Sequence, residues 1–340
     1  MENSDLQVSL TRSFARAVIF FHSTLWALSA CGSKDAKVQD PQDFRVALLT
    51  PGPISDQSWN AAAYEGLTAI RDSLSADIAH VQTRTPAEFE ENFRQYAASG
   101  FHLVFGHGFE FQDAAQRVGP EYPTTTFVTT GGSGTGPNIA AISFAFDEPS
   151  YLAGVAAAAA SRTGVIASIG GTELPPVRES FDAFAAGARA QNPDVVVLTA
   201  YLGNWEDAGA GKEQALAMLA RRADVIFQNA DAAGLGVFQA VRENGRAWII
   251  GSNANQNDIA PSVTLGSVVI DIPRAFLLVG RDVKSGTFEP RVIRFRTASG
   301  VVQWVPNSAI DAVPEGARRA IDSLRSAFAA GQGPSLASAP

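Results

Sequence analysis

The regular alternation of short apolar runs with segments of helical periodicity constrains the fold of this chain more than any other feature. Residues 44–49 form an apolar run that ends at a Pro-Gly-Pro turn, and residues 58–74 then carry apolar side chains at helical spacing. The pattern continues through strand candidates at 77–81, 102–105 and 125–129. An alternation of this kind predicts a parallel sheet with helices on both faces.

The same alternation begins again after residue 149. Its strand candidates lie at 165–169, 195–199, 225–228 and 247–250, separated by helical segments. Two α/β units of similar size in series predict two lobes with a cleft between them. Because ligands of such sheets bind beyond the carboxyl ends of the strands, we expect the site in loops that follow strands. These loops are 50–60, 106–111, 130–137, 170–176, 200–207, 229–234 and 251–258.

The N-terminal residues have the anatomy of an export signal. Two arginines precede an apolar stretch at 17–28, which is shorter than the roughly 20 apolar residues that span a membrane. The following Leu-Ser-Ala-Cys-Gly resembles the bacterial lipobox, in which the cysteine becomes the lipidated first residue of the mature protein. We therefore predict a signal peptide at 1–30, lipidation at Cys31 and a polar tether at 31–43. The alternative is a buried cysteine within an ordinary signal.

Composition and charge argue against several classes of function. The chain is 46% hydrophobic, enough for a sizeable core, and its net charge of −8 without a basic run argues against a nucleic-acid partner. Its four histidines and one cysteine show no zinc spacing, so we expect no metal and no cofactor. The glycine-rich segment 131–136 lacks both the P-loop lysine and the nucleophile-elbow pattern. We interpret the acidic pairs 147–148 and 206–207 as caps or hinge contacts, and expect no catalytic residue.

Two of the expected loops carry a tryptophan, one in each predicted lobe. Trp59 and Trp205 could sandwich a flat ring across the cleft, or they could pack in the core or the hinge, and position alone leaves both interpretations open. Asparagines surround them, and an amide both donates and accepts hydrogen bonds, which suits the edge of a heterocycle. We favour Asn60 and Asn253 as ligand contacts, whereas most of the other asparagines fit turns and caps. His107 either faces the cleft or simply ends a strand.

Several short motifs, spread over about residues 44–330, carry a family resemblance. Through their order and spacing the chain resembles the basic membrane protein family of bacterial substrate-binding lipoproteins, which includes the purine nucleoside receptors of ABC importers. The motifs lie at 56–60, 106–109, 151–154, 178–187, 192–194, 201–207, 211–213, 223–227, 234–238 and 313–315.

The resemblance implies an α/β fold of the type I periplasmic binding protein kind, with two Rossmann-like lobes of parallel strands joined by a three-strand hinge. The lobes would then comprise 44–146 plus about 254–284, and 147–253 plus about 285–330, with a tail at 331–340. The implied protein is a lipid-anchored monomer, exported to the periplasm or cell surface. It is not an enzyme, and it delivers a small molecule to an ABC permease by hinge closure.

The family's purine-stacking aromatics fall on Trp59 and Trp205, and its neighbouring amide falls on Asn60. The chain departs from the nucleoside receptors where Asn253 replaces their ribose-binding aspartate and where no lysine stands near residue 270. Thr129 and Thr130 also occupy the strand end that carries their base-binding aspartate. These departures favour a free, adenine-like base over a nucleoside. The expected ligand contacts are Asp56, Trp59, Asn60, Gly108, Phe109, Thr130, Trp205, Asn229, Asp231 and Asn253.

Two other functions stay open. A ligand-sensing protein that feeds a chemoreceptor or a kinase would share the same cleft. A secreted nucleoside-processing enzyme would need clustered acidic residues, and the expected loops carry mostly amides.

Overall fold

The first of two sheets begins with a strand that is buried on both faces. The computed structural model describes residues 44–336, and in β1 (Arg45–Thr50) every residue after Arg45 is buried, as expected for a parallel strand covered by helices. All pairings in this sheet are parallel, in the order β11-β5-β4-β3-β1-β2. The other strands are β2 (Asp77–Gln82), β3 (Leu103–Gly106), β4 (Thr126–Thr130), β5 (Ile139–Phe144) and β11 (Val292–Phe295).

Four helices cover this sheet and complete what we call the first lobe. The second of them starts at a capping box, in which Thr85 accepts from the backbone of Glu88 and the Glu88 side chain accepts from the backbone of Thr85. The helices are α1 (Trp59–Leu74), α2 (Pro86–Ala98), α3 (Gln112–Val118) and α8 (Ile272–Ser285), and the 3₁₀ turns are η1 (Phe109–Phe111) and η2 (Gly119–Glu121).

The second sheet has the order β12-β10-β9-β8-β6-β7, and only β12 runs antiparallel to its neighbour. With five helices it forms the second lobe. Its strands are β6 (Val165–Gly170), β7 (Val196–Tyr201), β8 (Val225–Asn229), β9 (Trp248–Asn253), β10 (Thr264–Ile270) and β12 (Val302–Pro306). Its helices are α4 (Asp147–Ala160), α5 (Pro175–Gln191), α6 (Ala208–Ala220), α7 (Asp231–Asn244) and α9 (Glu315–Ala329).

Helices α4 and α5 pack closely because each contributes a glycine to the contact. A Cβ at Gly154 would lie 1.9 Å from the carbonyl oxygen of Phe184, and one at Gly187 would lie 2.0 Å from that of Tyr151. No larger residue fits at either position without moving the helices apart. None of the helices within residues 44–336 is long and apolar enough to cross a bilayer.

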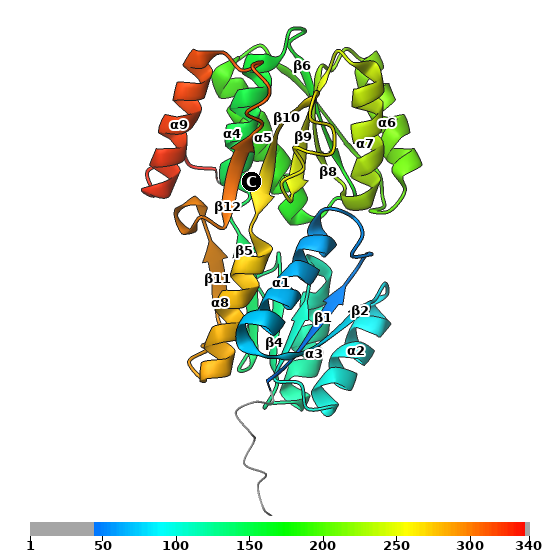
Figure 1. Cartoon of the computed structure of the whole chain (residues 1–340), viewed down its shortest axis with the longest axis vertical. Coiled ribbons are helices and arrows are strands. Elements are labelled where there is room, and N and C mark those ends of the chain that lie inside the picture. The colour runs from blue at the N-terminus through cyan, green and yellow to red at the C-terminus, as the bar shows by residue number, and fades with distance from the viewer. Residues whose placement is uncertain (1–43, 337–340) are drawn as a thin grey trace, which may run out of the picture. The chain divides into compact units, whose positions relative to one another are not determined.

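Within residues 44–336 the chain crosses between the lobes three times, from β5 to α4, from β10 to α8, and from β11 to β12 through η3 (Thr297–Ser299). Figure 1 shows the result of the second crossing, where the late helix α8 lies beside the early helix α1. Hydrogen bonds join the crossovers to one another, from Ala145 N to Phe295 O (2.8 Å) and from Asp271 N to Val301 O (2.7 Å). The hinge is therefore a connected unit.

The predicted fold class is confirmed by the two sheets and their alternating helices. The predicted sheet membership of two late strands is wrong. Strand β10 falls within 254–284 but pairs with β9 and β12 of the second sheet, whereas β11 falls within 285–330 but pairs with β5 of the first. Local hydrophobic pattern does not report which sheet a strand joins. The signal peptide, Cys31, the tether and residues 337–340 lie outside the described residues.

Candidate ligand-binding site

A cavity of about 420 Å³ lies between the lobes, at the carboxyl ends of the strands. The first lobe, the second lobe and the crossovers all contribute to its wall. Eight of the ten predicted contacts line it, and the two that do not are Asp56 and Thr130. The lining residues with aromatic, charged or polar side chains are Trp59, Asn60, Arg84, Phe109, Glu110, Ser143, Phe144, Phe146, Thr172, Glu179, Asn204, Trp205, Glu206, Asn229, Asp231 and Asn253.

The indole of Trp59, the first residue of α1, rests on a buried histidine. Its ring centroid lies 4.0 Å from that of His107, with 23° between the planes. His107 Nε2 lies 3.1 Å from the carbonyl oxygen of Trp59, and its Nδ1 lies 3.1 Å from the hydroxyl of Thr130. Because a carbonyl oxygen can only accept, Nε2 donates to it and Nδ1 accepts from Thr130. Burial lowers the pKa of His107 to about 3, so the ring is neutral.

Thr130 therefore helps to hold Trp59 in place and does not line the cavity. It is fully buried and acts on Trp59 through His107. The prediction that it touches the ligand is not matched by its position behind the cavity wall.

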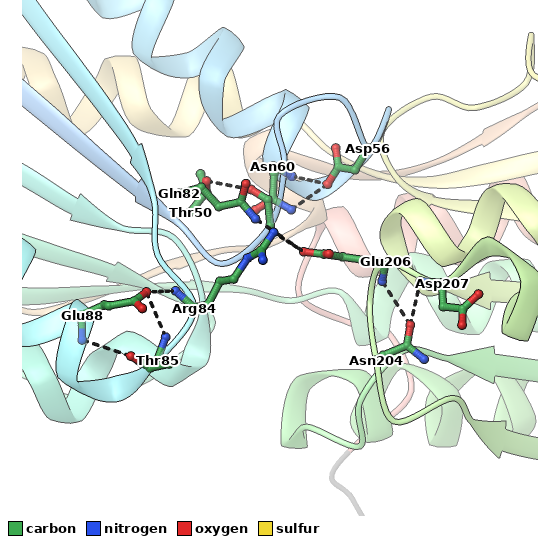
Figure 2. Close-up of polar contacts among 11 residues, drawn as sticks. Thr50, Asp56, Asn60, Gln82, Arg84, Thr85, Glu88, Asn204, Glu206 and Asp207 are labelled. Atoms are coloured by element: carbon green, nitrogen blue, oxygen red, sulfur yellow. Dashed lines mark hydrogen bonds and ion pairs between the residues drawn. The ribbon is translucent and has the colours of Figure 1, made fainter.

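Trp205 is held by the second lobe in a comparable way. A Cβ at Gly171 would lie 2.1 Å from Cε3 of the indole, so the ring lies directly against the Gly171 backbone. The carbonyl of Trp205 accepts from Ala233 N (2.9 Å) at the start of α7. The loop is closed by Asn204, whose Oδ1 accepts from Glu206 N (3.2 Å) and Asp207 N (2.8 Å), as Figure 2 shows.

Asp56 holds the start of α1 instead of facing the cavity. Its buried carboxylate accepts from the backbone nitrogens of Ser58 (3.0 Å), Asn60 (2.8 Å) and Ala61 (2.9 Å), which are free because the helix begins there. It also accepts from Asn60 Nδ2 at 2.8 Å (Figure 2). The Asn60 amide is thereby oriented, and its Oδ1 is buried without a hydrogen-bond partner within residues 44–336.

A polar cluster at the cavity wall joins the two lobes. Ser58 Oγ donates to Asp231 Oδ1 at 3.2 Å, and Asn253 Nδ2 lies 3.2 Å from the same oxygen and 3.2 Å from Asn229 Oδ1. Asp231 and Asn253 both have left-handed backbones, with φ of 49° and 65°. Burial, and next the nearby negative charge of Asp56, raise the pKa of Asp231 well above its ordinary value.

The structure places four charged side chains on the cavity wall that were not among the predicted ligand contacts: Arg84, Glu110, Glu179 and Glu206. Glu110 belongs to η1, in a loop expected to face the site, and burial raises its pKa. Arg84 follows β2 and lies 3.8 Å from Glu206 of the second lobe (Figure 2). The sequence signal for Glu110 was its position in the expected loop, two residues after the predicted contact Gly108. Within the described residues, no group of three or more His, Cys, Asp or Glu side chains is placed to hold a metal ion.

Residues 44–315 match the sequence model of the family described as ABC transporter substrate-binding protein PnrA-like, also called Bmp. The chain belongs to this family. Membership implies a small-molecule ligand and a permease partner, and it indicates an exported substrate-binding protein.

Two relatives of this PnrA-like chain are named for different roles. The ABC transporter nucleoside-binding protein BmpA of Lactococcus lactis is 31% identical over 67% of this chain and 70% of its own length. The transcriptional activator protein med of Bacillus subtilis is 28% identical over 85% of this chain and 89% of its own length.

Solved structures agree with the fold of this PnrA-like chain. A transcriptional activator of the comK gene from Bacillus halodurans has a TM-score of 0.73 at 26% identity, covering 86% of this chain and 100% of that one. A solute-binding protein of an ABC transporter from Aeropyrum pernix has a TM-score of 0.79 at 20% identity, covering 85% and 92%. The second likeness concerns the fold alone.

Proposed function

We propose that this family member captures a flat purine, a free adenine-like base in preference to a nucleoside, and delivers it to an ABC permease. The observation that carries the proposal is the placement of Trp59 and Trp205 on one cavity, from opposite lobes. Each indole is backed on one face by its own lobe, Trp59 by His107 and Trp205 by Gly171. A ring bound between the other two faces is held only when the lobes close, which couples binding to closure.

The polar wall supports a base more than a ribose. The Nδ2 of Asn253 is engaged with Asp231 and Asn229, so it is not free to donate a hydrogen bond to a ligand. Ile270 lines the cavity where a ribose-binding lysine would stand, and no lysine is among the described lining residues. Asn60, in contrast, offers a fixed carbonyl oxygen for an in-plane N–H of a base.

Calorimetry on ligand-stripped protein with adenine, hypoxanthine and adenosine tests the proposal. We expect a base to bind at least as tightly as its nucleoside. A tenfold preference for adenosine, about 1.4 kcal/mol, would contradict the base preference and point to Asp231 as the ribose contact. No binding of any purine would contradict the proposal as a whole.

We further propose that the mature protein is a monomer anchored to the membrane by lipid on Cys31, where it would meet the permease. A second candidate function is supported by the relative named as a transcriptional activator. In that case the ligand-bound protein would regulate a signalling partner. Deleting the gene would then change transcription in response to the ligand without reducing uptake of the labelled ligand, whereas a transporter component would show the reverse.

A further inference from the structure

The charge on the cavity wall is strongly unbalanced. Four acidic side chains line the cavity, and among the described lining residues Arg84 is the one basic side chain. Arg84 lies exposed at the rim, 3.8 Å from Glu206, so it balances that rim carboxylate. The acidic residues deeper in the site, Glu110 and Asp231, receive no such partner.

Glu110 and Asp231 approach the cavity from opposite lobes. The Glu110 carboxylate folds over Gly108, so that a Cβ there would lie 2.6 Å from Oε2, and no cation within residues 44–336 pairs with it. Asp231 is 6% exposed, and within the described residues its carboxylate is hydrogen-bonded only to the neutral side chains of Ser58 and Asn253. The ionisable groups that face Asp231 are the carboxylates of Asp56 and Glu110, and both have the same sign as Asp231.

The neighbouring histidine does not offset this charge. His107 is fully buried with a pKa lowered to about 3, so it is neutral whenever the carboxylates are ionised. Burial raises the pKa of both Glu110 and Asp231, which is the expected response of carboxylates that lack a counter-ion. Closing the lobes over a neutral ligand therefore either leaves this unfavourable charge in place or requires the carboxyls to take up protons.

We propose that the cleft selects a flat heterocycle that is positively charged in the bound state, stacked on Trp59 and Trp205 with its charge facing Glu110 and Asp231. The proposal rests on the proposed function and adds the charge class of the ligand. A cation removes the electrostatic cost of bringing two carboxylates into one closed cavity. Tryptophan is also the side chain that attracts a cation most strongly through its ring face.

The unpartnered polar atom at the site is a hydrogen-bond acceptor, which suits a ligand that brings N–H donors. Asn60 Oδ1 is a hydrogen-bond acceptor without a partner in the described chain, on a residue that lines the cavity. Carboxylates are acceptors when ionised. The site therefore offers acceptors to a ligand that brings N–H donors, as a protonated or N-alkylated aminopurine does.

The test compares two methyl derivatives of adenosine that differ in charge: 1-methyladenosine, which is protonated to a cation at neutral pH, and N6-methyladenosine, which is neutral. Calorimetry on the ligand-stripped full chain gives the ratio of their dissociation constants for the wild type, Glu110→Gln and Asp231→Asn. We expect each variant to shift this ratio against the cation by tenfold or more. Glu173→Gln is the matched control, because Glu173 is exposed and lies beside the cavity without lining it, and we expect a shift under threefold.

The ratio of the two dissociation constants within one protein does not change when both ligands lose affinity equally. Because two variants are measured, the test still works if one of them fails to fold. An unchanged ratio in both variants, or an equal shift in Glu173→Gln, overturns the inference while leaving purine capture intact. If no purine binds, the proposed function fails, and the same ratio is measured with 1-methylnicotinamide and nicotinamide. Absence of binding by that cation then overturns the inference as well.

Discussion

Trp59 and His107 lie with their rings 4.0 Å apart and nearly parallel, and this contact joins the start of α1 to the end of β3. The same histidine is bonded to the Trp59 carbonyl and to Thr130. The indole thus has little freedom before a ligand arrives, which lowers the conformational entropy lost on binding.

Replacing either tryptophan should weaken ligand binding. Trp59→Ala and Trp205→Ala should each cost about 1–3 kcal/mol of binding free energy through lost stacking. Trp59→Phe should retain most of the affinity, because a smaller ring still stacks. Calorimetry measures the affinity, and thermal unfolding checks the fold. Unchanged affinity, or global unfolding of both alanine variants, would assign these residues to the core.

Gly171→Ala should weaken binding without removing an aromatic side chain. The added methyl would lie 2.1 Å from Trp205 Cε3, so the indole has to move away from its present position. We expect a loss of affinity and a change in tryptophan fluorescence. Gly316→Ala is the control, because a Cβ there meets nothing within 4 Å. Wild-type affinity in Gly171→Ala would show that the position of Trp205 does not matter for binding.

Asp231→Asn should raise the stability of the ligand-free protein at neutral and higher pH. Burial raises the pKa of Asp231 above its unfolded value, which is about 3.9, so between the two pKa values the folded state binds more protons. This carboxyl therefore makes the free energy of unfolding fall as the pH rises above about 4. Asparagine has no such titration, so the variant's advantage should grow with pH.

Melting temperatures of the wild type and Asp231→Asn at about pH 4 and at pH 8 measure this difference. Asp182→Asn, which changes an exposed carboxylate on α5, is the control and should show no advantage that depends on pH. A variant that is less stable than the wild type at pH 8 would mean that the ionised carboxylate stabilises the contact with Ser58.

Cys31→Ser should release the protein from membranes if the predicted lipidation site is correct. Acyl chains supply the membrane affinity of a lipoprotein, at about 0.8 kcal/mol per buried CH₂ group. Fractionation and lipid labelling of both forms measure the change. A wild-type protein that carries no lipid by mass spectrometry would contradict the prediction.

Much of the fold was predictable because hydrophobic periodicity is a local property. The strand at 45–50 and the helix at 59–74 both follow from the spacing of their own apolar residues. The sheet that β10 joins depends on pairing with β9 and β12, which no local pattern reports. Local sequence pattern is limited in the same way for the residues of the site.

The places of Trp59 and Trp205 on the cavity were predictable only with the family resemblance, because their positions in loops after strands left core or hinge packing open. Asp56 occupies such a loop as well, yet its carboxylate turns inward to the free backbone nitrogens of α1. Glu110 looks like an ordinary surface acid in the sequence, and it is the tight turn of η1 that brings it to the cavity. Side-chain direction at a loop depends on backbone geometry that the residue types alone do not specify.

The ion pair between Arg84 and Glu206 should favour the closed arrangement of the lobes by a small, salt-dependent amount. It joins the two lobes at 3.8 Å, and both side chains are about half exposed or more, at 66% and 49%. Exposed pairs of this kind contribute up to about 1 kcal/mol and are screened by salt. Arg84→Ala should therefore weaken ligand affinity by no more than about fivefold at low salt.

The loss in Arg84→Ala should disappear near 1 M salt, where the Debye length is about 3 Å. Lys212→Ala is the matched control, because its partner Glu243, at 2.8 Å, belongs to the same lobe. Removing that pair leaves the contact between the lobes untouched, so we expect no change in affinity at either salt concentration. Calorimetry at both salt concentrations separates the outcomes. An Arg84→Ala loss that persists at high salt would mean that Arg84 contacts the ligand directly.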